Sequence, residues 1–227
     1  MTVLTTDLLI LASGKSSRYI SRTKKQKVKI NGKSIVDIVI SKFLAFKQIR
    51  DIYLVTDDLS LMNKSKYKDK FECIEGGSSR AKSVFCGLTY LSRKNPPKNV
   101  IIHDVVRPII DKRDLRNLIS HLPNIKTGIG LGYPLTNALK ELGKDNVIKK
   151  NVRKQNYFIS FTPQLFNFDK LIESYRHVIE KNIDVDDDLE VMHMNSHKVK
   201  ILKSSPFNVK LTYMEDLEQM KRAMKVL

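Results

Sequence analysis

The chain is predicted to fold as an α/β protein with a doubly wound, mostly parallel sheet, on three observations. Strand-like and helix-like segments alternate through the first half of the chain. Residues 99–103 are apolar on both faces, as in a central parallel strand, and the apolar residues 8–11 break into a small, polar, basic loop. A repeated β-α-β order gives a parallel sheet with helices on both sides. With 227 residues, 41% of them hydrophobic, the chain can form one large domain with a substantial core.

The elements of the first half follow from hydrophobic spacing. The helical segments repeat apolar residues every three or four positions, as in Ile35, Ile38 and Phe43. Ser34 and Asp37 stand where a helix start is expected to be capped. Strands are predicted at residues 8–11, 51–56, 71–75, 99–103 and 127–132. Helices are predicted at residues 34–46, 60–67, 80–93 and 112–122.

The regular order stops near Pro134. Residues 135–157 are polar, with a turn predicted at residues 143–146 between two extended runs. A hairpin that buries little of its own chain is marginal in isolation, so we expect an arm that packs on a partner subunit. Further on, Thr212 and Glu215 are expected to form a capping box at the start of the last helix. Helices are predicted at residues 166–180 and 187–193, and a strand at residues 199–202.

The loop after the first strand is a candidate phosphate site. It reads Ala12-Ser13-Gly14-Lys15-Ser16-Ser17-Arg18, followed by Lys25. Small residues let the backbone approach a ligand, and backbone N–H groups, Arg and Lys bind phosphate. A Walker A loop would need a glycine where Leu9 stands, and a Rossmann loop needs three glycines. On this segment alone, an ordinary polar loop between strand and helix fits equally well.

The formal net charge of +17 is large but spread through every segment. A basic surface attracts nucleic acid, anionic lipid or small phosphorylated ligands. No RNA-binding aromatic motif, zinc-finger spacing or basic heptad array accompanies the lysines, so nucleic-acid binding is not expected as the main function. No apolar stretch has the length of a membrane span, and no secretory signal precedes the first strand. Cys73 and Cys86 lack metal-site spacing and are expected to be buried thiols of a cytoplasmic protein.

Four further segments, taken with the first loop, resemble one family. They are residues 76–88 (GGSSRAKSVFCGL), residues 103–108 (HDVVRP), residues 162–164 (TPQ), and residues 208–217, where NVKLT precedes a DL pair. In this order they are similar to the motifs of the 2-C-methyl-D-erythritol 4-phosphate cytidylyltransferases and the related ribitol-5-phosphate cytidylyltransferases. The resemblance covers residues 8–217. It implies the fold of the nucleotide-diphospho-sugar transferases across residues 1–227 as a single domain, with a dimerisation arm at about residues 135–157.

The resemblance implies that CTP and a polyol phosphate react to give a CDP-polyol and pyrophosphate. The acceptor phosphate is itself the nucleophile, so catalysis rests on positioning and on cancelling charge at the α-phosphorus. Arg18 and Lys25 match cations that bind the triphosphate, and Lys210 matches the lysine that stabilises the α-phosphate. Asp104 matches the carboxylate that holds Mg²⁺. The residues that match the nucleoside site are Ala12, Ser13, Gly14, Gly77 and Ser83.

The acceptor side departs from the family pattern. Ala138 stands where the family has a threonine on the arm, and Lys154 stands where it has an arginine that holds the acceptor phosphate. Lysine supplies the charge but not the bidentate fork. Retained Lys140 favours methylerythritol phosphate over ribitol phosphate as the acceptor. The residues expected on the acceptor side are Lys154, Arg153, Ala138, Asp187 and Thr212.

Several alternatives stay open. A ribitol-5-phosphate or other polyol-phosphate cytidylyltransferase would have the same nucleotide site, and a non-catalytic nucleotide- or RNA-binding protein could keep the fold. Retention of Arg18, Lys25, Asp104 and Lys210 argues against the non-catalytic reading. His103 is expected to be a structural neighbour of Asp104 rather than a base. On these grounds the chain is predicted to be a homodimer that binds CTP, Mg²⁺ and a polyol phosphate.

Overall fold

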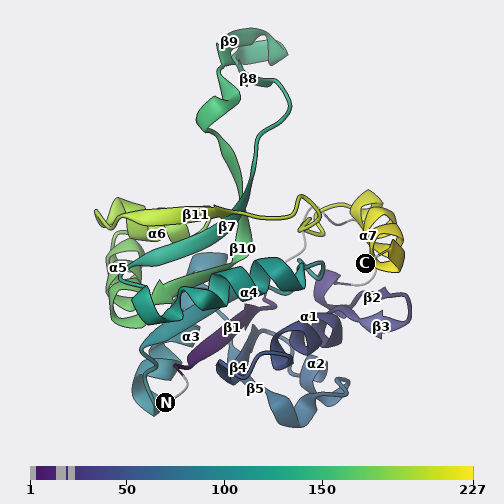
Figure 1. Cartoon of the computed structure of the whole chain (residues 1–227), viewed down its shortest axis with the longest axis vertical. Coiled ribbons are helices and arrows are strands. Elements are labelled where there is room, and N and C mark those ends of the chain that lie inside the picture. Colours follow the sequence, from purple (N-terminus) through teal and green to yellow (C-terminus); the bar gives the residue numbers. More distant parts are fainter. Residues whose placement is uncertain (1–3, 14–18, 20–23, 227) are drawn as a thin grey trace.

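The computed structural model describes residues 4–13, 19 and 24–226 (Figure 1). Seven strands form the main sheet, and two short antiparallel pairs stand outside it. The strands of the main sheet are β1 (Thr6–Leu11), β4 (Ile49–Thr56), β5 (Glu72–Glu75), β6 (Asn99–Asp104), β7 (Gly128–Pro134), β10 (Phe158–Asn167) and β11 (Val199–Lys203). The outlying pairs are β2 (Lys29–Ile30) with β3 (Lys33–Ser34), and β8 (Leu139–Leu142) with β9 (Ile148–Val152).

The main sheet has the strand order β11-β7-β10-β6-β1-β4-β5. β1 lies near its centre, parallel to both β4 and β6, and β5 and β11 extend the parallel pairing at the two edges. β10 is the exception, since it runs antiparallel to both β6 and β7. The predicted doubly wound, mostly parallel sheet is therefore confirmed.

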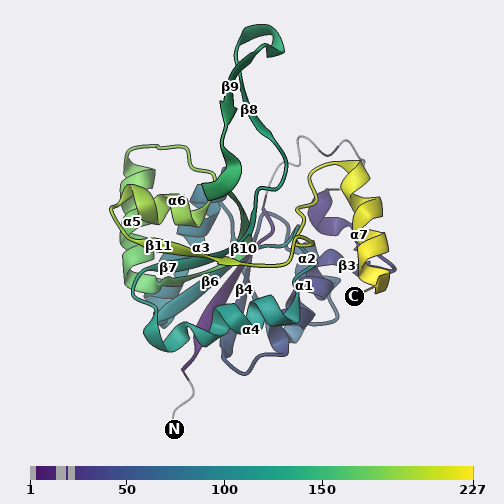
Figure 2. The same ribbon diagram turned by 45° about the horizontal axis from the view of Figure 1, so that its top comes forward.

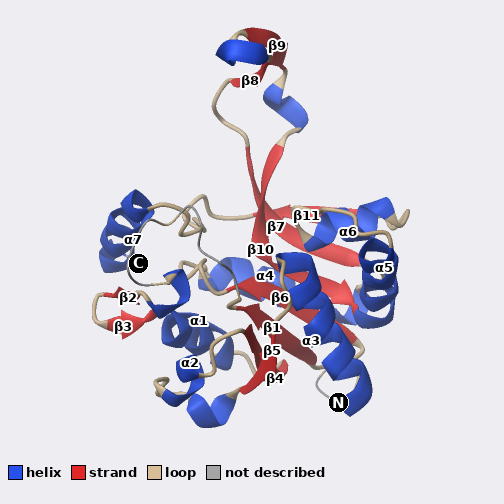
Figure 3. Cartoon of the chain, turned by 180° about the vertical axis from the view of Figure 1, so that it is seen from behind, coloured by secondary structure: helices blue, strands red, loops and turns tan. Residues whose placement is uncertain are grey.

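Helices cover both faces of this sheet. They are α1 (Ile35–Leu44), α2 (Ser60–Asn63), α3 (Arg80–Lys94), α4 (Lys112–Ser120), α5 (Phe168–Glu180), α6 (Asp188–Met194) and α7 (Met214–Val226). Figure 1 shows α4 in front of the sheet, and Figure 3 shows α3 in front of it when the molecule is seen from behind. Single turns of 3-10 helix lie at η1 (Lys25–Lys27), η2 (Lys68–Lys70), η3 (Leu122–Asn124), η4 (Lys144–Asn146) and η5 (Lys154–Asn156).

The alternation of side chains along β1 explains why this strand is apolar throughout. Leu8 and Ile10 pack into the core shared with α1 and α4, whereas Leu9 and Leu11 pack into the core shared with α3, α5 and α6. Leu8, Leu9 and Ile10 have no solvent exposure. Burial of apolar area on both faces is the main stabilising term for such a strand, and it places the end of β1 between two helix layers.

Three details differ from the sequence predictions. α2 is a single turn rather than the helix expected over residues 60–67. β10 was not predicted as a strand, and the helix expected from residue 166 begins at Phe168. The capping box predicted at the last helix is wrong, because Asp216 Oδ2, not Glu215, accepts the N–H groups of Thr212 and Tyr213 at 2.7 Å each.

Two smaller expectations also fail. The Ser34 side chain makes no capping hydrogen bond to α1, although helix α1 begins directly after it. Cys73 and Cys86 are free, as expected, but only half-buried. Their partial burial raises the pKa of both thiols, which leaves them protonated and unreactive near neutral pH.

The predicted arm projects far from the sheet. β7 and β10 leave the sheet together as a stalk, and β8 and β9 form an antiparallel hairpin at its end (Figures 1 and 2). The turn predicted at residues 143–146 contains η4, with Asp145 in a left-handed backbone conformation (φ 58°). Over the described part of the chain, no helix combines the length and apolar character needed to cross a membrane.

Candidate functional site

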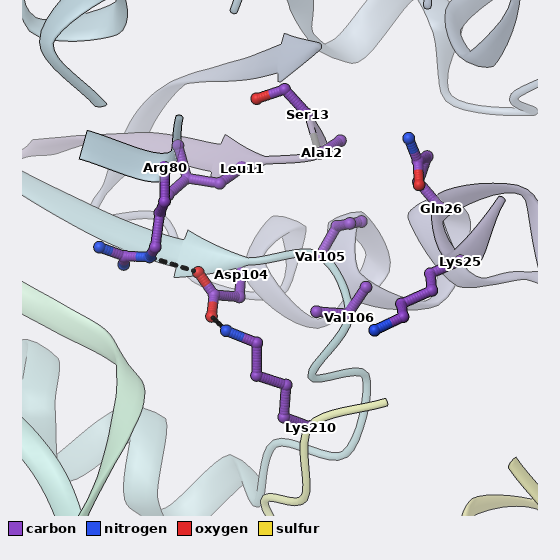
Figure 4. A pocket seen from close by; sticks show the side chains of 10 residues that line it. All are labelled: Leu11, Ala12, Ser13, Lys25, Gln26, Arg80, Asp104, Val105, Val106 and Lys210. Carbon is purple, nitrogen blue, oxygen red and sulfur yellow. Dashed lines mark hydrogen bonds and ion pairs between the residues drawn. The ribbon is translucent and has the colours of Figure 1, made fainter. Parts of the chain in front are cut away.

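A cavity of about 160 Å³ opens at the carboxyl ends of β1 and β6 (Figure 4). Open α/β sheets bind their ligands at this edge, because loops from neighbouring parallel strands converge there. Asp104 comes from the end of β6, and Lys210 comes from the segment that precedes α7. The lining residues are Leu11, Ala12, Ser13, Lys25, Gln26, Arg80, Asp104, Val105, Val106 and Lys210.

Asp104 is the centre of charge in this cavity. Lys210 Nζ donates to its Oδ2 at 2.8 Å, and Arg80 Nε donates to its Oδ1 at 3.2 Å. Arg107 Nε lies 3.8 Å from Oδ2. Burial alone would raise the pKa of Asp104, but the three cations outweigh burial and hold that pKa well below its usual range. The carboxylate is therefore charged at any physiological pH.

Arg80 was not among the predicted site residues, although it lies in the GG-x-x-R segment. Its Nη1 and Nη2 donate to the two carboxylate oxygens of Asp188 at 3.1 and 2.7 Å, and Tyr175 O–H donates to the same carboxylate. Asp188 and Tyr175 have no solvent exposure. The guanidinium is thus fixed between Asp188 and Asp104, which are 84 positions apart in the sequence.

His103 takes part in hydrogen bonds that hold the end of β6 in place. Asp104 N–H donates to Thr162 Oγ1, which lies 3.0 Å from His103 Nδ1, and His103 Nε2 lies 3.1 Å from the carbonyl of Arg107. Because a carbonyl only accepts, we assign the ring hydrogen to Nε2, and Nδ1 accepts from the hydroxyl. Burial lowers the pKa of His103 to about 3, so the ring is neutral. This agrees with the structural role that was expected for it.

The segment that carries Lys210 is tied to the same network. Asn208 Nδ2 donates to the carbonyl of Thr162 at 2.8 Å, and Arg107 Nη1 donates to the carbonyl of Asn208 at 2.9 Å. Arg107 also lies 5.3 Å from the ring centroid of Phe161. Arg107 therefore braces this corner of the site, and Lys210 is held at a defined distance from Asp104.

Small residues at the ends of β1 and β5, together with Ser83 of α3, lie beside the cavity. Ser83 Oγ accepts from Ser13 Oγ at 2.8 Å and from Gly77 N–H at 3.1 Å. A Cβ atom on Gly76 would lie 2.7 Å from Ser13 Oγ, so only glycine fits there. A Cβ atom on Gly77 would lie 2.5 Å from Lys82 Cβ. Three of the residues predicted for the nucleoside are thereby brought together beside the cavity.

Lys25, predicted for the triphosphate, and Ala12, predicted for the nucleoside, both line the cavity. Lys25 Nζ lies 5.8 Å from the centroid of the Tyr19 ring. The predictions for Gly14 and Arg18 fall outside the described residues.

The residues predicted for the acceptor are not in this cavity. Ala138, Arg153 and Lys154 lie on the exposed arm, and Lys154 Nζ donates to the carbonyl of Thr136 within the arm. Asp187 caps α6 by accepting from Glu190 N–H at 2.9 Å.

Two further hydrogen bonds involve Asp187 and Thr212, which were also predicted for the acceptor side. Asp187 Oδ2 also accepts from Gln164 Nε2 at 3.0 Å, at the base of the stalk. Thr212 Oγ1 donates to the carbonyl of Lys210 at 3.3 Å and so supports the lysine rather than lining the cavity. Within one chain, Ala138, Arg153 and Lys154 therefore lie apart on the arm, whereas Asp187 and Thr212 adjoin residues that contact Arg80 and Lys210 of the cavity.

The metal-ligating capacity of the site is limited. Nowhere in residues 4–13, 19 and 24–226 do three or more His, Cys, Asp or Glu side chains gather as a metal site. Mg²⁺ is commonly held by one or two carboxylates together with substrate phosphate oxygens and water. Asp104 fits a magnesium ion that arrives with a polyphosphate, and it does not fit a metal held by the protein alone.

The charge balance points to an anionic ligand. Arg80, Arg107 and Lys210 surround Asp104, and Asp188 neutralises part of their charge, while Lys25 adds a further cation at the opposite wall. A strand-edge site of this kind positions and stabilises phosphate groups. Together with the mostly parallel sheet, it defines the class of α/β nucleotidyltransferases.

Comparison with known proteins narrows this class. The sequence profile of the IspD family, 2-C-methyl-D-erythritol 4-phosphate cytidylyltransferase, matches residues 6–225, and the chain belongs to this family. A relative of that name from Petrotoga mobilis is 32% identical over 216 residues, which cover 92% of this chain and 94% of the relative. A relative of the same name from Clostridium acetobutylicum is 29% identical, over 92% of this chain and 93% of the relative.

The fold is shared with solved structures. The 4-diphosphocytidyl-2C-methyl-D-erythritol synthase from Anaerococcus prevotii superposes with a TM-score of 0.84 at 20% identity, covering 98% of this chain and 96% of that one. A Francisella tularensis 2-C-methyl-D-erythritol 4-phosphate cytidylyltransferase gives a TM-score of 0.80 at 24% identity, covering 96% of this chain and 99% of that one. At this identity the comparison establishes the nucleotide-diphospho-sugar transferase type of fold.

Proposed function

We propose that the chain transfers CMP from CTP to 2-C-methyl-D-erythritol 4-phosphate, giving CDP-methylerythritol and pyrophosphate for isoprenoid synthesis by the non-mevalonate route. The observation that carries the proposal is the Asp104 cluster, in which Lys210 and Arg80 contact a strand-end carboxylate inside a cavity that Lys25 also lines. Membership of the family supports the choice of both substrates.

The chemistry requires positioning rather than a strong base. An oxygen of the acceptor phosphate attacks the α-phosphorus of CTP, and the bond from that phosphorus to the bridging oxygen breaks to release pyrophosphate. Lys210 would donate to an α-phosphate oxygen as charge develops there, and Lys25 would hold the β- and γ-phosphates. Arg18 is assigned to the same triphosphate from the sequence alone. Ala12, Ser13, Gly77 and Ser83 would enclose the nucleoside through small side chains and backbone groups.

Asp104 would be the protein ligand of Mg²⁺. When bound, the ion neutralises phosphate charge and orients the triphosphate for in-line attack. Lys210 and Arg80 already neutralise Asp104 in the free protein, so nucleotide binding has to redistribute these contacts. Lys210 can follow the phosphate because its side chain is 39% exposed.

The arm would complete the acceptor side in a homodimer. Ala138, Arg153 and Lys154 lie on the arm, which projects away from the main sheet (Figure 2). At that place, these residues would reach a site when the arm packs on another copy. We place the dimer in the cytoplasm, where its phosphorylated substrates are retained.

Pyrophosphate release from CTP and Mg²⁺ tests the proposal. Parallel reactions would contain 2-C-methyl-D-erythritol 4-phosphate, ribitol 5-phosphate or no acceptor. Release with the first acceptor alone is expected. Release with ribitol 5-phosphate alone would move the protein to cell-envelope synthesis, and CTP binding without release with either would refute the proposed reaction.

A further inference from the structure

Gln26 is the second residue of η1 and enters the cavity next to Lys25. The two side chains reach into the cavity from the side opposite Arg80 and Asp104 (Figure 4). The Gln26 residue is only 3% exposed. A glutamine amide carries two N–H donors and one acceptor, and buried amides in folded proteins nearly always find partners.

Gln26 departs from that rule. Its Nε2 is buried and has no hydrogen-bond partner among the residues that the structure describes. An unpaired buried donor destabilises a fold, so its presence needs a reason. In the described part of the chain, the other buried donor without a partner near the site is Arg107 Nε, but it lies 3.8 Å from Asp104 Oδ2, whereas Asn99 and Gln164 do not line this cavity. At Gln26, therefore, an unpaired buried donor coincides with a candidate ligand site.

We propose that Gln26 Nε2 donates a hydrogen bond to a phosphate oxygen of the bound nucleotide, an inference that rests on the proposed use of CTP. Phosphate oxygens accept hydrogen bonds only, so they suit a group whose free atom is a donor. The neighbouring Lys25 supplies a flexible positive charge at the same wall. Gln26 adds a neutral, directional donor beside that charge.

The alternative ligand group is the nucleoside. Its expected residues, Ser13, Gly77 and Ser83, lie together at the ends of β1, β5 and α3 and already bond to one another. Gln26 instead belongs to the wall that Lys25 provides. This placement favours the triphosphate, and the two assignments predict different behaviour towards cytidine.

Replacing Gln26 by Met provides the test, because Met has a similar shape but no donor. The free variant should melt a few degrees higher than the unaltered chain, since the unpaired N–H is removed. Its affinity for CTP with Mg²⁺ should fall about tenfold or more, the usual worth of a hydrogen bond to a charged group. Its affinity for cytidine should not change. Calorimetric titration without an acceptor gives both affinities, and differential scanning calorimetry gives the melting temperatures.

Two further variants sharpen the comparison. Gln26→Glu should weaken CTP binding more than Gln26→Met, because it places a carboxylate beside the triphosphate. Gln219→Met is the matched control, at an exposed position of α7, and should leave melting and binding unchanged.

The outcomes separate the two proposals. If the unaltered chain does not bind CTP, the proposed function fails. If it binds CTP but Gln26→Met binds equally well, the role of Gln26 is refuted while the function stands. A Gln26→Met chain that melts lower would show that the amide is structural, and equal losses for CTP and cytidine would assign it to the nucleoside.

Discussion

Asp188 is a buried carboxylate whose loss should be costly. It has no solvent exposure and accepts two hydrogen bonds from Arg80 and one from Tyr175. Asp188→Asn keeps the shape but removes the charge, leaving the guanidinium with Asp104 as its remaining carboxylate partner. Removing one partner of a buried ion pair typically costs 3–5 kcal/mol, and the Arg80 side chain is still 23% exposed, which favours the low end. We therefore expect a loss of about 3 kcal/mol in the free energy of unfolding.

Urea unfolding followed by far-ultraviolet circular dichroism measures this loss, since the chain contains no tryptophan for fluorescence. A loss of about 3 kcal/mol corresponds to a melting temperature lower by roughly 6–12 °C in a chain of this size. Asp186→Asn is the matched control, because Asp186 belongs to the same acidic run but is exposed. It should change stability by less than about 0.5 kcal/mol.

A second comparison tests the pair itself. Replacing Asp188 by Leu and Arg80 by Met together removes both charges, and apolar replacement of a whole buried pair is often close to neutral for stability. The double variant should therefore be more stable than Asp188→Leu alone. If Asp188→Asn unfolds like Asp186→Asn, or if the double variant loses the sum of the single effects, the pairing argument is wrong.

Three further predictions concern the nucleotide site and its support. Lys210→Ala should lower turnover about 10²–10³-fold with the fold intact, measured by pyrophosphate release and circular dichroism; near-normal turnover would contradict its role. Gly76→Ala should weaken CTP binding in calorimetry, because its Cβ would lie 2.8 Å from Ser13 Cβ, and an unchanged affinity would count against this contact. Folded His103 has a pKa of about 3 and stays neutral while the unfolded chain takes up a proton below pH 6.5, so stability present above pH 6.5 is lost as the pH falls towards 3. Urea unfolding at pH 6.5, 5.5 and 4.5 should show a steeper slope than His103→Gln, with a difference that approaches about 1.4 kcal/mol per pH unit below about pH 5.5, and equal slopes would refute the assignment.

The fold could be predicted from the sequence where a strand is buried on both faces, because such a strand is a continuous apolar run. β1 and β6 are continuous apolar runs because both helix layers pack on them, and their carboxyl ends locate the site. The sequence of β10 contains no such continuous apolar run. Its Thr162 and Gln164 are polar yet buried, and their hydrogen bonds go to Asp104, His103 and Asp187, partners that only the folded chain supplies. A polar residue in a strand pattern is ambiguous until those partners are known.

Some residues of the site could also be predicted from the sequence, and others could not. Asp104 and Lys210 could be predicted because they stand in segments that resemble family motifs, and the structure brings them to 2.8 Å. The Arg80–Asp188 pair joins residues 108 positions apart, and no local spacing encodes such a contact. The signal for Arg80 was nonetheless present, since it stands in the GG-x-x-R segment. Gln26 gave no signal, because its significance lies in a missing partner that only a three-dimensional structure reveals.

The last prediction concerns the arm, where a substitution should abolish turnover without weakening the binding of CTP. Leu142, Val147 and Ile148 at its end are 52–65% exposed, an arrangement that water disfavours unless a partner covers it. A Val147→Lys, Ile148→Lys double variant should be monomeric in light scattering and should still bind CTP, since the cavity belongs to one chain. It should lose pyrophosphate release, since Lys154 would no longer reach a neighbouring site. Leu59→Lys, at a position 62% exposed on the body, is the control and should remain dimeric and active. A monomeric arm variant with unaltered turnover would refute the shared site, and a monomeric unaltered chain would refute the dimer.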